Sequence, residues 1–477
     1  MADVRLPDPQ ISITDDGTPT SGVSGDVYFS KSGGIAETRH VFLKGIDAPT
    51  IWQTGSYLRV GELGFGTGLN FLVTWHDWNA TAPKGAELDY LAVEGYPIPV
   101  AQLRDILSRV PELASEAEAL LAEWPVRVGG VHRLSFDAGR VRLTLMFGDA
   151  GEMLAQAAGA VDVWYLDGFA PSKNPDMWTD DVLYQVRRLS APGARLATFS
   201  AAGAVRRALA ELGFAVEKRP GFGRKRDCVA AVLPGTREQA VPETIAVVGA
   251  GIAGCTLART LLARGMNVTL IDKADAPGSA ASGNPAALLA PRLPRERTVL
   301  GRIMAASYLH AVRFYDVLAS EGATVWFGER GGLALARNTD EAERQSRAIS
   351  AFGWPEEVMR QVDAQEAAAL SGIETESGGL WFSAAGTLNP PAIAKHLARD
   401  IRYVQADVGG FEKTPGGWVL TTHDGTNIGV YGAIVLAAGV GLMDMAGASH
   451  WPLKANRGQL AYLSELRVGP MVPVTYG

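Results

Sequence analysis

Cysteine and histidine are scarce in this chain of 477 residues. It has two cysteines, Cys228 and Cys255, which excludes a disulfide framework and a cysteine-based metal cluster. The seven histidines show no HxxxH or HExxH spacing, so we expect no metal. No apolar run approaches the roughly 20 residues that cross a bilayer, and the N-terminal MADVRLPDPQ lacks a signal-peptide pattern. We therefore expect a cytoplasmic protein with no membrane partner.

The chain also lacks a strong excess of charge of one sign. Its 44 Lys and Arg residues face 51 Asp and Glu residues, a formal net charge of −7. This balance argues against a uniformly basic nucleic-acid-binding protein, but it permits a local basic surface, because phosphate contacts act at short range in salt. The length predicts two or three domains. We expect a monomer.

Glycine, by contrast, is abundant: 55 residues, spread without a period. Two glycine-rich turns follow apolar, strand-like runs, GELGFGTGLN at 61–70 and VVGAGIAG at 247–254. Glycines between a strand and a helix let the backbone turn sharply and approach a ligand closely. The sequence therefore predicts two nucleotide-type pockets.

Strand-like and helix-like stretches alternate through most of the chain. We expect short extended segments from Asp26 to Leu43, a helix from about Leu69, and a hairpin that turns at Ala138 and Gly139. The polar stretch 234–243 is interpreted as a linker between domains 1–233 and 244–477. The alternation predicts α/β domains with mostly parallel, helix-covered sheets.

The first turn has the spacing GxGxG, with an acid two residues before it. Further acids end the next two predicted strands, in LAVEG and LMFGD. Because ligands of open α/β sheets bind at the carboxyl ends of the strands, these acids favour a class I S-adenosylmethionine methyltransferase over a plain tight turn. The predicted donor-binding residues are Glu62, Gly64, Gly66, Gly68, Glu94 and Asp149.

The fourth strand of this domain ends in LDGFAPSKNPDMW, which places Asp167 at the pocket mouth. Methyl transfer needs alignment and a free lone pair on the acceptor, and a carboxylate can hold an amine N–H. Asp167 is the predicted catalytic residue; the alternative is a helix N-cap. Phe169 and Pro171, with Trp178, either wall a planar base or belong to the core.

Four motifs together resemble one family: DVYFSKSGGIAETRHVFL, GELGFGTGLNF, LDGFAPSKNPDMW and GFGRKRD. They are similar to the methyltransferase half of the bifunctional tRNA 5-methylaminomethyl-2-thiouridine biosynthesis family (MnmC), and the resemblance runs in order over essentially the whole chain. It implies methylation of a primary aminomethyl group on the wobble uridine of certain tRNAs. It also implies that Glu94 and Asp149 hold S-adenosyl-L-methionine and that Asp167 faces the acceptor amine.

The second turn is a dinucleotide fingerprint followed by a helix, a second strand and an acid, in TIAVVGAGIAGCTLARTLLARGMNVTLID. The glycines permit the turn and the approach to a pyrophosphate, and the acid accepts the ribose hydroxyls. The fingerprint alone leaves FAD and NAD open. Its predicted cofactor-binding residues are Gly249, Gly251, Gly254 and Asp272.

GSAASGNPAALLAPRL at 278–293 and AIVLAAGVG at 433–441 resemble the flavin half of the same family, of the glycine/D-amino-acid oxidase type. The resemblance implies FAD, which oxidises a carboxymethylaminomethyl side chain; hydrolysis of the imine releases glyoxylate and leaves the primary amine. Ser282 and Asn284 either form hydrogen bonds with the cofactor or only shape their loop, and Gly439 is expected near the cofactor. Arg457 and Arg292 are candidates to anchor the substrate carboxylate, against the alternative of surface or structural arginines.

Chains of that family continue past the position that corresponds to Gly477. If Gly477 is the natural end, we expect weak FAD binding or an inactive oxidase, with the methyltransferase half less affected. The expected fold is thus a Rossmann-like class I methyltransferase domain followed by an FAD-binding Rossmann-type domain.

The segment EKRPGFGRKRD carries five basic residues against two acidic ones. Arg224, Lys225 and Arg226 are predicted to contact tRNA phosphates, against the alternative of a solvated charged surface. Three functions remain open at this point. The first is modification of a tRNA wobble uridine with S-adenosyl-L-methionine and FAD, and the second is a fusion that acts on a small amine metabolite. In the third, the flavin domain is inactive or only a structural platform.

Overall fold

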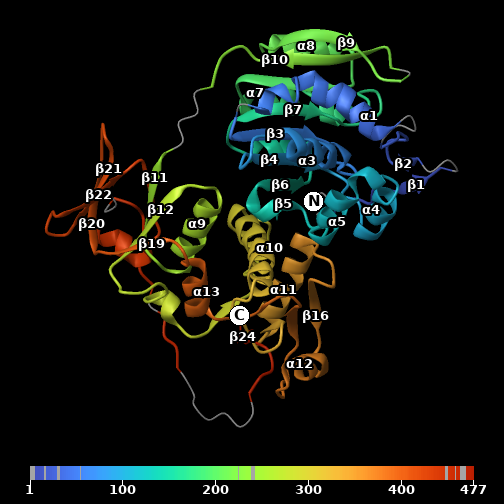
Figure 1. The fold of residues 1–477 in the computed structure, drawn as a ribbon. Coiled ribbons are helices and arrows are strands. Elements are labelled where there is room, and N and C mark those ends of the chain that lie inside the picture. Colours follow the sequence, from blue (N-terminus) through green and yellow to red (C-terminus); the bar gives the residue numbers. More distant parts are fainter. Residues whose placement is uncertain are drawn as a thin grey trace. The chain divides into compact units, whose positions relative to one another are not determined.

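The computed structural model describes residues 6–14, 18–28, 33–53, 55–223, 225–237, 242–445, 450–456, 458–461 and 469–476 (Figure 1). The chain divides into two compact units, residues 1–238 with 352–355 and residues 239–351 with 356–477. Part of the predicted linker, 238–241, lies outside the described residues. In the described part of the chain, no helix is long and apolar enough to cross a membrane.

The first unit is built around an eight-stranded sheet in the order β5-β6-β4-β3-β7-β8-β10-β9. The central strands β6, β4, β3, β7 and β8 are parallel, and β5 and β10 pair antiparallel with their neighbours. The order reverses at β3, between β4 and β7, which is where open α/β sheets bind ligands. The strands are β3 Tyr57–Leu63, β4 Glu87–Glu94, β5 Gly130–Phe136, β6 Val141–Phe147, β7 Val161–Leu166, β8 Ser190–Thr198, β9 Ala215–Pro220 and β10 Asp227–Val232.

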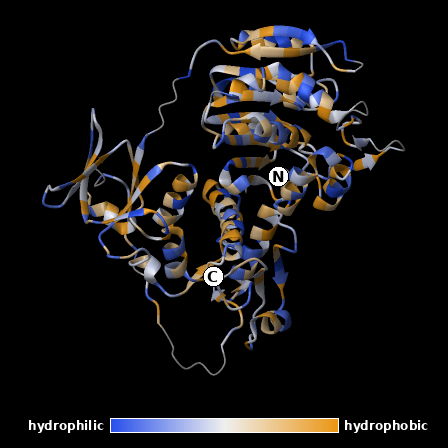
Figure 2. Cartoon of the chain, viewed as in Figure 1, coloured by the Kyte–Doolittle hydropathy of each residue, from blue (hydrophilic) through white to orange (hydrophobic). Residues whose placement is uncertain are grey.

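Helices cover both faces of this sheet, as predicted. One buried cluster joins α3, α4 and α5 to the sheet around Phe71 and Tyr90, and a second joins α6, α7 and α8 around Trp164 and Leu183. Hydrophobic and hydrophilic residues are mixed along these helices (Figure 2), as expected for helices with one face on a core. The helices are α3 Leu69–Thr81, α4 Val100–Leu107, α5 Ala114–Ala122, α6 Ala150–Ala155, α7 Asp180–Leu189 and α8 Gly203–Glu211.

The expectation of extended segments up to Leu43 is wrong. Helical residues run from Gly34 onward, as α1 Gly34–Thr38, a π-helical turn Arg39–Leu43 and a 3-10 turn Lys44–Ile46. Phe42 and Ile46 are buried four residues apart, the spacing of one helical face, so packing on the core favours helix. The expected hairpin is confirmed: β5 and β6 are joined at 137–139, where Ala138 has φ 54°.

The remaining elements of the first unit are short. They are β1 Ile11–Ile13, β2 Pro19–Ser21 and α2 Thr50–Gln53. β1 and β2 form an antiparallel pair outside the main sheet.

The second unit contains a parallel four-stranded sheet in the order β19-β12-β11-β23. Its strands are β11 Thr244–Val248, β12 Asn267–Asp272, β19 Arg402–Gln405 and β23 Ala433–Leu436. Helices α9 Ile252–Ala263 and α13 Pro390–Leu397 share the buried cluster on one face of this sheet. The late strand β23 pairs directly with β11, so it ends beside the second glycine turn.

Three further sheets complete the described part of this unit, in the orders β13-β18-β14, β16-β17-β15-β24 and β20-β21-β22. Their strands are β13 Ala287–Leu289, β14 Trp326–Phe327, β15 Gly332–Leu335, β16 Met359–Val362, β17 Gly379–Phe382, β18 Gly386–Leu388, β20 Val408–Thr414, β21 Gly417–Thr422, β22 Asn427–Tyr431 and β24 Val474–Tyr476. The helices are α10 Val299–Ser320, α11 Thr339–Phe352 and α12 Ala364–Ser371.

Candidate active sites

The first glycine turn, between β3 and α3, needs glycine for two reasons. Gly64, Gly66 and Gly68 all have positive φ, of 81°, 53° and 76°, a region that residues with a β-carbon rarely adopt. A β-carbon on Gly64 would also lie 2.4 Å from the main-chain oxygen of Asp167. The turn therefore lies directly against the end of β7.

Glu94 ends β4 with its carboxylate on this turn. Its Oε2 accepts a hydrogen bond of 2.6 Å from the Gly66 amide, and its Oε1 accepts one of 2.7 Å from the Tyr96 amide. Burial raises the pKa of Glu94, and these main-chain donors oppose the rise. A carboxylate has lone pairs beyond these two bonds, so the predicted contact of Glu94 with ribose hydroxyls stays chemically feasible.

Asp149 follows β6 and is the N-cap of α6. Its Oδ1 accepts a hydrogen bond of 3.0 Å from the Glu152 amide, and the residue is exposed. The amide of Gly148 donates a bond of 3.0 Å to the main-chain oxygen of Glu94. The strand ends that carry Glu94 and Asp149 are therefore tied together beside the turn.

Glu62 and Asp167 are bridged by a residue that the sequence reasoning missed. The Asn70 Nδ2 donates to Glu62 Oε1 at 2.8 Å and to Asp167 Oδ2 at 2.6 Å. The Tyr90 hydroxyl donates to Glu62 Oε2 at 3.0 Å. Asn70 is the second residue of α3, directly after GxGxG, and this position in GTGLN is the signal that could have found it.

Asp167 has the electrostatic setting of a proton acceptor. Burial raises the pKa of its carboxyl to about 7, while the Asn70 hydrogen bond and the charge of Lys225 oppose the rise. A group that titrates near neutral pH can accept a proton efficiently there. The next helical residues, Pro175–Trp178, come much later, so Asp167 is not a helix N-cap.

Aromatic side chains gather beside Asp167. The rings of Tyr28 and Phe169 pack edge to face at 5.4 Å, and the Trp178 Nε1 donates to the Phe169 main-chain oxygen at 2.9 Å. Trp178 also packs edge to face with Phe199 at 6.4 Å. Tyr28, which the sequence reasoning missed, lies on the glycine turn, because a β-carbon on Gly66 would be 3.2 Å from its ring.

Pro171 and the basic segment lie around this group. Pro171 is half-buried in the loop after Asp167. The Lys225 Nζ is 3.0 Å from Glu37 Oε1 and 4.1 Å from the centre of the Phe199 ring, and Arg226 is exposed. Arg224 lies outside the described residues, and phosphate contacts by Lys225 and Arg226 stay predictions.

The second glycine turn, between β11 and α9, has no room for a side chain at two positions. Gly249 has φ 106° and its β-carbon would be 2.4 Å from the main-chain oxygen of Ala437. A β-carbon on Gly254 would be 1.8 Å from the oxygen of Gly249. Gly251 begins the helix N-terminus, where main-chain amides can bind a phosphate. These residues fit a pyrophosphate.

Asp272 ends β12 and faces the same turn. Its Oδ2 accepts a hydrogen bond of 2.6 Å from the Ala250 amide, and its Oδ1 accepts one of 2.9 Å from the Ala274 amide. The Ser282 Oγ accepts a bond of 3.0 Å from the Ile252 amide at the start of α9. Asp272 and Ser282 thus both bind main-chain amides of the fingerprint, and their contacts with a cofactor stay predictions.

The other residues predicted for the flavin site are Asn284, Gly439, Arg292 and Arg457. The Asn284 Nδ2 donates to the Ala281 main-chain oxygen at 2.9 Å, which shapes its own loop. Gly439, with φ 57°, begins a 3-10 helix shortly after β23. Arg292 is exposed, and Arg457 lies outside the described residues. In the described ranges, no group of three or more His, Cys, Asp or Glu residues is arranged to hold a metal.

These two sites define a methyltransferase and a dinucleotide-dependent enzyme in one chain, and family comparisons agree. Residues 111–234 match the family described as S-adenosyl-L-methionine-dependent methyltransferase, and residues 244–475 match FAD-dependent oxidoreductase. The predicted fold class and the two cofactors, S-adenosyl-L-methionine and FAD, are confirmed. The fingerprint left FAD and NAD open, and the family match over residues 244–475 identifies FAD.

Relatives that share one name match most of the chain. A protein of Magnetococcus marinus is 40% identical over 464 residues, which is 94% of this chain and 69% of the relative. One of Ralstonia nicotianae is 42% identical over 460 residues, 93% of this chain and 70% of the relative. Both are called tRNA 5-methylaminomethyl-2-thiouridine biosynthesis bifunctional protein MnmC. The chain belongs to this bifunctional family, as its motifs predicted.

A solved structure is also similar. The crystal structure of MNMC2 from Aquifex aeolicus is 25% identical, with a TM-score of 0.37, and the match covers 48% of this chain and 72% of that one.

Proposed function

We propose that the chain performs two consecutive reactions on the wobble uridine of tRNA in the cytoplasm. The first is FAD-dependent removal of the carboxymethyl group from 5-carboxymethylaminomethyl-(2-thio)uridine, and the second is N-methylation of the resulting amine to give 5-methylaminomethyl-(2-thio)uridine. One observation carries the proposal: the same chain contains Asp167 next to the first glycine turn and, in its second unit, a flavin-type fingerprint. The amine that one reaction releases is the acceptor that the other needs.

In the methylation step, this chain aligns the acceptor and takes a proton from it. Bound S-adenosyl-L-methionine supplies a methyl group on a sulfonium centre, and transfer requires a nucleophile with a free lone pair. Asp167 accepts a hydrogen bond from the amine, and its pKa of about 7 allows it to take the proton at neutral pH. Tyr28, Phe169 and Trp178 offer aromatic surface on which a flipped-out base can stack.

In the oxidation step, the fingerprint of the second unit holds the cofactor. Bound FAD supplies hydride-acceptor chemistry. Gly251, at the start of α9, would bring main-chain amides to the pyrophosphate, Gly254 keeps the turn close to the helix, and Asp272 would accept from the adenosine ribose. Arg292 remains a candidate for the substrate carboxylate, since a fixed cation next to the ring would orient the C–H bond that is broken.

The test is mass spectrometry of wobble nucleosides after incubation of tRNA with the chain and each cofactor separately. With carboxymethylaminomethyl tRNA and FAD, we expect the aminomethyl nucleoside; with added S-adenosyl-L-methionine, we expect the methylaminomethyl nucleoside. With aminomethyl tRNA, S-adenosyl-L-methionine alone should suffice. Methylation of small amines without methylation of tRNA would contradict the proposal. Methylation without oxidation in the presence of FAD would restrict the function to the first unit.

A further inference from the structure

Asn70 is buried next to the reacting group but was not part of any predicted site. Its residue exposure is 6%, and its side-chain amide makes three hydrogen bonds, to Glu62, to Asp167 and with Thr38. A buried amide whose oxygen and both N–H groups form hydrogen bonds has one preferred orientation. Asn70 therefore holds a fixed direction between two carboxylates.

Thr38 determines that direction. Its hydroxyl donates a hydrogen bond of 2.8 Å to Asn70 Oδ1, and Thr38 is only 3% exposed. A flipped amide would turn its oxygen toward the carboxylates of Glu62 and Asp167, which are acceptors when ionised, and would leave the Thr38 hydroxyl facing N–H groups. The Thr38 bond thus directs both N–H groups toward the carboxylates.

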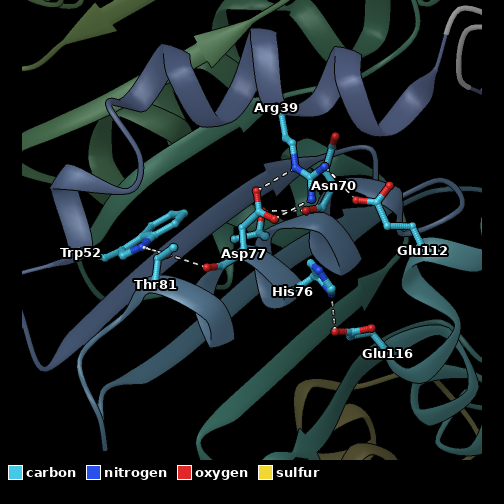
Figure 3. Close-up of polar contacts among 9 residues, drawn as sticks. Arg39, Trp52, Asn70, His76, Asp77, Thr81, Glu112 and Glu116 are labelled. Atoms are coloured by element: carbon cyan, nitrogen blue, oxygen red, sulfur yellow. Dashed lines mark hydrogen bonds and ion pairs between the residues drawn. The ribbon is translucent and has the colours of Figure 1, made fainter.

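Thr38 is itself anchored to α3 by its neighbour in the chain. The Arg39 guanidinium binds both carboxylate oxygens of Asp77, at 3.0 and 2.8 Å, and its Nη1 binds Glu112 at 2.8 Å (Figure 3). A paired guanidinium–carboxylate contact of this kind fixes orientation as well as distance. The end of α1 is therefore held against the helix that carries Asn70.

We propose that Asn70, oriented by Thr38, is a positioning residue for methyl transfer: it holds Asp167 as a carboxylate with Oδ1 turned to the acceptor amine. The hydrogen bond from Asn70 uses Oδ2 of Asp167, so Oδ1 is the oxygen that takes the amine N–H. The proposal rests on the methylation step proposed above and names a part of its machinery that acts through Asp167.

The charges around Asp167 explain why this donor matters. Burial and the carboxylate of Glu37, from α1, raise the pKa of Asp167, and Glu62, from β3, interacts with it as a like charge. Tyr90, from β4, has a raised pKa, so its hydroxyl stays neutral and donates a hydrogen bond to Glu62. Lys225, from the segment before β10, is the cation that lowers the pKa, together with the Asn70 hydrogen bond.

The loss of the Asn70 bond should therefore make Asp167 harder to ionise. Loss of a hydrogen bond that orients a reactive group, as measured for the partners of metal ligands, typically lowers activity about 10–100-fold. We expect Asn70→Leu to lower kcat of methyl transfer by roughly that factor and Thr38→Val by about 3–10-fold. In both variants the acidic limb of the pH–rate profile should move to higher pH, while the Kd for S-adenosyl-L-methionine changes less than about threefold.

Two variants make this test specific. Thr38→Ser keeps the hydroxyl and should restore kcat and the position of the acidic limb. Thr74→Val removes a buried hydroxyl that lies on α3 and donates to the main-chain oxygen of Asn70, at 2.6 Å, instead of to its side chain. We expect Thr74→Val to lower thermal stability without moving the acidic limb, which separates a positioning role from a general loss of packing.

The measurement uses the full chain, aminomethyl tRNA and S-adenosyl-L-methionine over a range of pH, with thermal unfolding of each variant as a check on folding. An acidic limb that is the same in the unaltered chain, Thr38→Val and Asn70→Leu would overturn the inference. So would an equal shift in Thr74→Val. If the unaltered chain methylates no tRNA at all, the proposed function fails instead, and the two failures are thereby distinguished.

Discussion

Gly64 and Asp167 are in contact through their main chains: a β-carbon on Gly64 would lie 2.4 Å from the carbonyl oxygen of Asp167. The Asp167 amide also donates a hydrogen bond of 3.1 Å to the main-chain oxygen of Leu63, the last residue of β3. The first glycine turn and the end of β7, where Asp167 lies, are therefore joined through their main chains. The position of Asp167 depends on the absence of a side chain at Gly64.

Gly64→Ala should consequently impair both binding and chemistry. Adoption of φ near 81° costs a residue with a β-carbon about 1–2 kcal/mol, and the clash with Asp167 adds about 1 kcal/mol or more. Gly85→Ala is the matched control, because Gly85 has φ 82° with nothing within 4 Å of its β-carbon position. Chemical denaturation and titration with S-adenosyl-L-methionine should show lost donor affinity in Gly64→Ala alone. Equal behaviour of the two variants would refute the argument.

Methyl transfer should depend on the ionisation of Asp167. Because the pKa of its carboxyl is raised to about 7, the carboxylate that accepts a proton forms as the pH rises through that value, and kcat/KM should rise with it. Asp167→Asn keeps the size of the side chain but cannot accept the proton, so activity should fall at least about 100-fold. Equilibrium titration should find donor affinity nearly unchanged. Loss of donor affinity would instead assign Asp167 to the donor site.

Asp89 should make the first unit less stable in acid. The Arg142 guanidinium, with help from Tyr57 and Arg133, lowers the pKa of Asp89 from 3.8 to about 2. The stabilisation is present above the unfolded value of 3.8 and is lost as the pH falls through about 2; it amounts to roughly 2 kcal/mol. Urea unfolding from pH 7 to pH 2 should show this loss in the unaltered chain but not in Asp89→Asn.

The same variant also tests the worth of the buried ion pair at neutral pH. Asp89→Asn leaves Arg142, whose side chain is 7% exposed, without one of its carboxylates, and breaking a buried pair typically costs about 3–5 kcal/mol. Asp105→Asn is the control, since its pair with Arg109 is solvent-exposed and should contribute less than about 1 kcal/mol. Similar unfolding free energies for the two variants would contradict the distinction.

FAD binding should fail when the second turn is filled. A β-carbon on Gly254 would lie 1.8 Å from the main-chain oxygen of Gly249, so Gly254→Ala must displace the turn that faces the pyrophosphate. We expect at least about a tenfold loss of affinity when the apoprotein is titrated with FAD. Gly265→Ala, at φ 70° with open space around it, should lose stability without losing flavin affinity. Flavin binding that survives in Gly254→Ala would place the cofactor elsewhere.

The sequence was sufficient for features set by local rules. Glycines at fixed spacing after apolar runs, and acids at strand ends, predicted both Rossmann-type sheets and the turn residues Gly64 and Gly254. These signals are local because a tight turn constrains φ and side-chain size at each position. The helix over Gly34–Leu43 was missed because its stability comes from packing of Phe42 and Ile46 on a distant part of the chain.

The polar network was missed for a similar reason. Asn70 lies 97 residues from Asp167 and 32 from Thr38, so its spacing along the chain does not show which side chains it contacts. Tyr28 reaches the glycine turn from the N-terminal segment, again across a long stretch of chain. The position of Asn70 after GxGxG could have marked it as a residue of the turn, but its partners follow from the tertiary fold, which periodicity and spacing do not specify.

The basic segment before β10 gives a last prediction, on tRNA binding. Each phosphate contact contributes to the slope of log K against log salt concentration, by about 0.7–0.9 per neutralised charge. Arg226 is exposed, and Arg226→Ala should lower affinity and reduce the slope by about that amount. Lys225 is held by Glu37 and the Phe199 ring, so Lys225→Ala distinguishes a phosphate contact from a role within the pocket.

If Lys225 acts within the pocket, Lys225→Ala should leave the salt slope unchanged. The substitution should then raise the pKa of Asp167, because the charge of Lys225 lowers that pKa. The acidic limb of methyl transfer would then move to higher pH in Lys225→Ala but not in Arg226→Ala. Lys84→Ala, at an exposed turn before β4, serves as the control for general charge. Filter binding at several salt concentrations separates the cases, and an Arg226→Ala slope equal to that of Lys84→Ala would remove the basic segment from the tRNA interface.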